Sequence, residues 1–97
     1  MRKIQRLFWR PDRVEHILKR HEVTPEEVEE ALFDDSRGLL LKVGSAERNP
    51  EETVYRYLGR TAGGRYLFVA LIYTGHGEAL PLTARDMDGA ERRRYSR

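Results

Sequence analysis

Two stretches in the first third of the chain have the periodicity of amphipathic helices. The first collects side chains on one helix face at spacings of three and four residues: Val14, Ile17, Leu18 and His21. The second begins at Thr24, which can cap a helix start, and Glu27 is placed to complete a capping box with it. The pattern therefore predicts helices over residues 12–21 and 25–33.

After these stretches the pattern changes to runs that are typical of strands. Four such runs follow one another, at 38–43, 53–60, 65–74 and 78–85. The third is rich in β-branched and aromatic residues, which predicts a central strand. His76 stands between two glycines and predicts a hairpin turn. Pro81 has no N–H to donate, so the last run belongs at a sheet edge or at a bulge.

A second capping box, Asp88 with Glu91, predicts a short final helix that runs through Tyr95. The order of two helices, three or four antiparallel strands and a short helix is that of an α+β domain. Ninety-seven residues make a single domain, 1–97, with room for one helical layer on one sheet. We expect the first two helices to cover one face of the sheet, which leaves the other face solvated or functional.

Composition narrows the class of protein. The chain has no cysteine, so disulfides and thiolate metal sites are excluded, and its histidines lack the spacings of a metal site. We expect neither a metal ion nor another cofactor. The longest apolar run, 67–73, is too short to span a bilayer, and nothing resembles a signal peptide, so we expect a cytoplasmic protein.

The formal net charge of +2 hides a segregation of charge along the chain. Residues 1–20 hold seven Lys and Arg against two acidic residues, and residues 85–97 hold five Arg against three. Residues 22–35 hold seven acidic residues without Lys or Arg, which is most simply a solvated face. Arginine outnumbers lysine fifteen to three. Two explanations stay open: genome composition, and phosphate binding, for which guanidinium is the better fork.

The segment TARDMDGAERRRY, residues 83–95, indicates where a site lies. A strand delivers Arg85 to the end of the sheet. The capped turn that follows brings Arg92, Tyr95 and either Arg93 or Arg94 close to it. A strand end and a first helical turn can together form a concave cationic pocket. For the run of three arginines, the competing explanation is a solvated helix face.

Five segments occur in an order and spacing that match a known family: FW at 8–9, KRHEV at 19–23, LFDD at 32–35, YRYLGRTAGGRYLFV at 55–69 and TARDMDGAERRRY at 83–95. With these segments the chain resembles the BrnT toxins, ribonucleases of type II toxin–antitoxin systems with a RelE-like fold. It departs from the family pattern at Arg10, Val54 and Asp86, where the family has an acidic cap, an arginine and a basic residue. Arg56 lies two residues after Val54, hence on the same strand face, and can substitute for that arginine.

The resemblance implies metal-independent RNA cleavage, in which a ribose 2′-oxygen attacks the adjacent phosphate. In that chemistry Arg85 would bind the scissile phosphate, with Arg56 or Arg60 assisting. His21 would be the proton carrier, since histidine titrates near neutral pH, and Tyr95 and Arg92 would orient the substrate. The remaining RNA-binding candidates are Arg92, Arg60, Trp9 and Arg94. The resemblance also implies a cognate antitoxin of the ribbon-helix-helix type.

Each of these assignments has a structural alternative. His21 can be a packed residue at a helix end, and Trp9 can cover the sheet instead of stacking on a base. For the protein as a whole, the alternative is a catalytically inactive toxin-like module that acts through a protein or nucleic-acid partner. The sequence leaves both a monomer and a homo-oligomer open.

Overall fold

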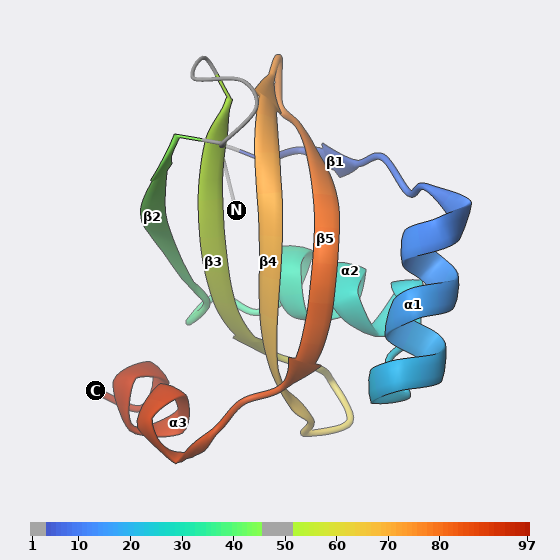
Figure 1. Ribbon diagram of the computed structural model, residues 1–97. Coiled ribbons are helices and arrows are strands. Elements are labelled where there is room, and N and C mark those ends of the chain that lie inside the picture. The colour runs from blue at the N-terminus through green and yellow to red at the C-terminus, as the bar shows by residue number, and fades with distance from the viewer. Residues whose placement is uncertain (1–3, 46–51) are drawn as a thin grey trace.

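The computed structural model describes residues 4–45 and 52–97 as an α+β fold (Figure 1). Its elements, in chain order, are β1 (Arg6–Leu7), α1 (Pro11–His21), α2 (Pro25–Phe33), β2 (Leu39–Ser45), β3 (Thr53–Arg60), β4 (Tyr66–Gly75), β5 (Glu78–Asp86) and α3 (Gly89–Tyr95). The predicted helices are confirmed, and the four predicted strand runs correspond to β2, β3, β4 and β5.

The described residues form one five-stranded sheet in the order β1-β5-β4-β3-β2. Its four long strands are antiparallel neighbours, as predicted. The fifth strand, β1, was not expected. It pairs parallel with the start of β5 through only two residues, which is too short to leave a periodic pattern in the sequence.

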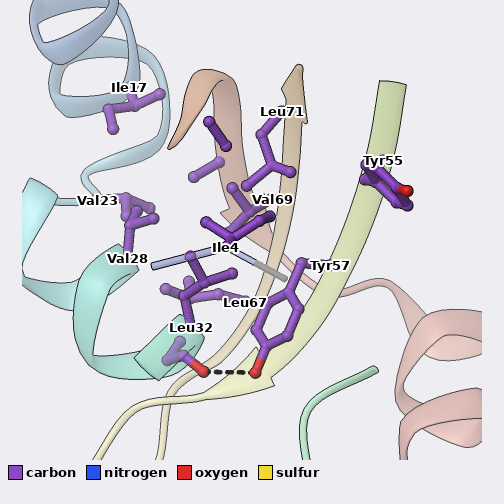
Figure 2. Packing of buried hydrophobic residues seen from close by; sticks show 13 residues of the cluster. Ile4, Ile17, Val23, Val28, Leu32, Tyr55, Tyr57, Leu67, Val69 and Leu71 are labelled. Atoms are coloured by element: carbon purple, nitrogen blue, oxygen red, sulfur yellow. Dashed lines mark hydrogen bonds between the residues drawn. The ribbon is translucent and has the colours of Figure 1, made fainter. Parts of the chain in front are cut away.

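The helices lie on different sides of this sheet (Figure 1). In Figure 1, α2 lies behind the sheet, α1 stands beside β5, and α3 lies at the lower left, below the lower ends of β2 and β3. The main core lies on the side of α1 and α2, where Ile17, Val28 and Leu32 pack with Tyr57 and Val69 (Figure 2). A second, smaller cluster lies on the side of α3. The sheet face opposite the first two helices is therefore only partly covered.

The sequence signals at the helix starts are confirmed. The Thr24 hydroxyl accepts a hydrogen bond from the Glu27 N–H at 3.2 Å, and the Glu27 carboxylate accepts one from the Thr24 N–H at 3.0 Å. Asp88 and Glu91 make the same reciprocal pair in α3. The start of α1 has no side-chain cap at Arg10, where the resembled family has an acidic residue.

Two predictions about single positions turn out differently from one another. Pro81 is buried beside a bulge of the β4–β5 ladder, and β1 pairs with β5 only at Glu78 and Ala79, so the edge or bulge expected for a proline is confirmed. Leu18 was placed on the buried face of the first helix, but 49% of it is exposed. Because α1 stands beside β5, Ile17 is its only buried residue.

Candidate functional site

Strand alternation places the side chains of Arg56, Phe68 and Arg85 on the sheet face on the side of α3. In the ladder Phe68 of β4 stands between Leu58 of β3 and Arg85 of β5, and Arg56 pairs with Ala70 one row away. The guanidinium carbon of Arg85 lies 4.1 Å from the centroid of the Phe68 ring. An arginine over an aromatic face is attracted by the ring quadrupole. Arg85 therefore packs over the Phe68 ring and does not project freely from the end of the sheet.

The guanidinium of Arg85 is held by the carboxylate of Glu91. Its two terminal nitrogens donate to the two carboxylate oxygens at 2.8 and 2.9 Å, and the Asp88 N–H donates to the same carboxylate at 2.9 Å. The hydrogen bond from Arg85 lowers the pKa of Glu91, and the positive charge of Arg56 adds to that lowering. The carboxylate is therefore ionised at neutral pH and fills the fork of Arg85.

A groove with a volume of about 300 Å³ lies beside this ion pair. We call it the arginine groove. Its apolar floor comes from strand residues Leu41, Leu58 and Phe68. Its cationic rim comes from Arg56 of β3, Arg94 of α3, and Arg97, which follows α3. Glu91 forms part of its wall. The arrangement can accept an anion that carries a flat apolar group.

A larger groove, with a volume of about 780 Å³, lies between the α2–β2 turn, the β3–β4 turn and the end of α3. We call it the turn groove. Its lining includes the charged and aromatic side chains of Asp34, Arg37, Arg60, Tyr66, Tyr95 and Arg97. Guanidinium carbons of Arg60 and Arg92 lie 5.2 and 4.0 Å from the centroid of the Tyr66 ring.

Tyr95 fixes the end of α3 to the α2–β2 turn. Its hydroxyl donates to the Asp35 carboxylate at 2.6 Å, and its ring stands edge-on to Tyr66 at 5.7 Å between centroids. Burial, together with this hydrogen bond, raises the pKa of Tyr95 to about 12. Burial alone would raise the pKa of Asp35, but the hydrogen bond from Tyr95 and the backbone N–H groups of Arg37 and Arg60 outweigh it and lower that pKa.

The structure separates two of the predicted site residues from the rest. His21 ends α1, with its ring 5.6 Å from that of His16, whose Nε2 lies 3.3 Å from the Thr83 hydroxyl. Trp9 packs against the main core, and its Nε1–H donates to the Glu29 carboxylate at 2.8 Å. Neither residue lines one of the two grooves. The other six gather on the side of α3: Arg56, Arg60, Arg85, Arg92, Arg94 and Tyr95.

The sequence interpretation missed the acidic partners of this site. The charge pattern of residues 22–35 predicts a solvated face, but Glu27, Glu29 and Asp35 all accept hydrogen bonds from side chains of other elements. Glu91 was recognised only as part of a capping box. Glu91 lies six residues after Arg85, across a short capped turn. This spacing is the sequence signal that could have predicted the ion pair.

No protein-family model matches the sequence, and a search of curated proteins finds no match. Within residues 4–45 and 52–97, no helix is long and apolar enough to cross a membrane.

Proposed function

We propose that this protein is a ribonuclease toxin of the BrnT kind, which cleaves RNA without a metal ion through attack of a ribose 2′-oxygen on the adjacent phosphate. One observation carries the proposal. Both terminal nitrogens of Arg85 donate hydrogen bonds to the Glu91 carboxylate, and the positive charge of Arg56 stabilises the same carboxylate. Carboxylate and phosphate offer a guanidinium the same two-pronged acceptor. A phosphate that displaced Glu91 would meet both arginines.

The arginines would act on the charge that develops during cleavage. The pentavalent phosphorus transition state carries more negative charge on its oxygens than the starting diester, and preorganised cationic donors stabilise it preferentially. Arg85 and Arg56 have this role in the proposal. Arg56 and Arg94 line the arginine groove, and Arg85 lies beside it, paired with Glu91 of its wall. Arginine cannot serve as the base, because it stays protonated.

In this proposal the 2′-oxygen bonds to phosphorus as the P–O5′ bond breaks, which leaves a 2′,3′-cyclic phosphate. As the resemblance implies, His21 would take the proton of the 2′-hydroxyl and return it to the departing 5′-oxygen. His21 lies outside the arginine groove. The pKa of Asp86, the residue after Arg85, is lowered mainly by the hydrogen bond from Arg65 and in smaller part by the charge of His21. The imidazole therefore lies near the Asp86 carboxylate at the end of β5, on the sheet face opposite Arg85, because successive strand residues point to opposite faces. Tyr95, whose pKa is raised to about 12, stays neutral and is not a base. Its single O–H is donated to Asp35, so in this proposal it orients the substrate by fixing the end of α3.

The same carboxylate favours a second candidate function. If Glu91 is never displaced, Arg85 is a structural ion-pair member and the face under α3 binds a partner without cleaving it. The protein is then a toxin-like binding module, and its partner is a protein or a nucleic acid. The ribbon-helix-helix antitoxin that the resemblance implies is a partner in either case.

Cleavage of a labelled single-stranded RNA in the presence of a metal chelator tests the proposal. We expect Arg85→Ala and Arg56→Ala each to lower the cleavage rate by roughly 100-fold, the cost of one lost transition-state donor. Arg85→Lys should recover part of the rate, because lysine lacks the fork. Arg20→Ala is the matched control, since Arg20 is exposed on α1 and lines neither groove.

Glu91→Gln separates the two candidates. Glutamine keeps the capping box but removes the charge that competes with phosphate. The ribonuclease proposal predicts tighter RNA binding by this variant, with the far-ultraviolet circular dichroism of the parent. A parent protein that binds RNA but never cleaves it, and does not arrest growth when it is expressed, would leave only the binding module.

A further inference from the structure

We infer that the turn groove is a subsite for a second nucleotide of single-stranded RNA, next to the nucleotide whose phosphate meets Arg56 and Arg85. The inference rests on the proposed function and extends it to substrate selection. It means that the protein recognises more of the RNA strand than the phosphate to be cleaved.

The two grooves can be occupied by one strand. Arg97 lines both of them. Arg56 and Arg60 point to the same face of β3, four residues apart, which is about 13 Å along a strand. The separation is wider than one phosphate group, so the two grooves are distinct anion sites. A strand that placed one phosphate at Arg56 would carry its next nucleotide towards Arg60.

Cationic groups in the turn groove are available to a ligand. No ion pair within the described residues involves Arg37, Arg60 or Arg97. The nearby Asp35 carboxylate is already satisfied, because it accepts from Tyr95 and from two backbone N–H groups. In this respect the turn groove differs from the arginine groove, where the wall residue Glu91 is engaged by the neighbouring Arg85.

An aromatic platform in the same groove suits a nucleobase. Tyr66 is half-buried there, with the guanidinium groups of Arg60 and Arg92 near its ring. Unstacked bases of single-stranded RNA stack on aromatic rings and on guanidinium planes. The volume of about 780 Å³ also lies in the range of pockets that enclose a small organic ligand.

The carboxylate of Asp34 disfavours an acidic peptide as the ligand of the turn groove. Its side chain is exposed at the groove and makes no hydrogen bond with the described residues. A free carboxylate repels an acidic peptide, which carries many negative charges in a short length. It can instead accept a hydrogen bond from an N–H group at the edge of a base. One phosphate plus one base fits the observed mixture of cations, aromatic surface and a single acceptor.

Binding of short RNAs of different length tests the subsite. The probes are a mononucleotide, a nucleoside 3′-phosphate, and a tetranucleotide of mixed sequence, both 2′-O-methylated so that the nucleophile is blocked. We expect the parent to bind the tetranucleotide roughly tenfold more tightly than the mononucleotide, as one stacked base contributes. Arg37→Gln with Arg60→Gln should remove most of this length gain and leave mononucleotide binding nearly unchanged.

The matched control is Arg20→Gln with Arg93→Gln, which makes the same change of net charge at exposed positions outside both grooves. It should keep the length gain. If the groove variant weakens both probes equally, the arginines act only through net charge and the subsite is overturned. If inorganic polyphosphate binds as the tetranucleotide does, the groove takes phosphate alone and the inference is equally overturned.

Cleavage of unmodified RNA by the parent, measured in parallel, separates this inference from the proposed function. Cleavage without a length gain overturns the subsite and leaves the catalytic proposal standing. A length gain that the groove variant removes, without cleavage by the parent, supports the subsite and overturns the catalytic proposal.

Discussion

The buried side chain of Tyr57 limits which residues can occupy the neighbouring positions. It is fully buried, and its hydroxyl donates to the Ala31 carbonyl at 2.8 Å (Figure 2). Burial raises its pKa, so the hydroxyl stays a neutral donor. A Cβ atom added at Gly38 or at Gly59 would overlap the Tyr57 ring or hydroxyl. These two glycines are therefore required by packing and not by a turn.

At this scale we predict the effect of two substitutions on the free energy of unfolding. Tyr57→Phe should lower it by about 1 kcal/mol, because the Ala31 carbonyl loses its donor. Gly38→Ala should lower it by about 1–3 kcal/mol, the usual cost of overpacking. Gly63→Ala is the control, since the nearest atom to its added Cβ is 3.8 Å away. Urea denaturation measures all three, and equal midpoints for Gly38→Ala and Gly63→Ala would contradict the packing argument.

At the scale of elements, Arg65 joins segments that are far apart in sequence. Its guanidinium donates to the backbone carbonyls of His21 and Glu22 at the end of α1, at 3.0 and 2.7 Å. It also pairs with Glu27 in the first turn of α2 and with Asp86 at the end of β5. Glu27 thus caps α2 and anchors it to the sheet through the same carboxylate. The start of α2 is held by local and long-range contacts together.

Thr24→Ala tests the local contribution. The Glu27 N–H would lose its acceptor, and the free energy of unfolding should fall by about 1 kcal/mol. Thr24→Ser keeps a hydroxyl acceptor and should stay near the parent. The measurement is the urea midpoint of each variant. An unchanged midpoint for Thr24→Ala would show that Arg65 and the core fix the start of α2 without help from the cap.

At the scale of the whole molecule, three carboxylates with lowered pKa values hold its peripheral parts. Asp35 binds Tyr95 of α3, Asp86 binds Arg65, and Glu91 binds Arg85. In each case the pKa in the folded protein lies below the ordinary value of the group, 3.8 for aspartate and 4.5 for glutamate. Each ionised group therefore stabilises the fold at neutral pH, and this stabilisation is lost as the carboxylate becomes protonated.

We therefore predict that the protein loses stability as the pH falls below the ordinary glutamate value of 4.5. Urea midpoints at a series of pH values measure the loss. Glu91→Gln should flatten the part of the curve that belongs to Glu91, and Glu15→Gln, at an exposed pair on α1, should not. A stability that stays constant into strong acid would contradict the assignment of these three carboxylates.

The sequence by itself determined the elements that depend on neighbours in the chain. The starts of α2 and α3 follow from capping boxes whose partners are three residues apart, and the extents of β3 and β4 follow from the composition of single runs. Such signals are local, so they survive without knowledge of the fold. The grouping of Arg85 with the arginines of α3 also followed, because a short capped turn connects them.

Only the tertiary structure decided which side chains meet across elements. It placed His21 and Trp9 away from the two grooves, filled the fork of Arg85 with Glu91, and brought Asp35 to Tyr95 over a separation of sixty residues. Strand order and the choice of sheet face for each helix set these contacts. Both depend on the burial of apolar surface by the whole chain, which no short stretch of sequence contains.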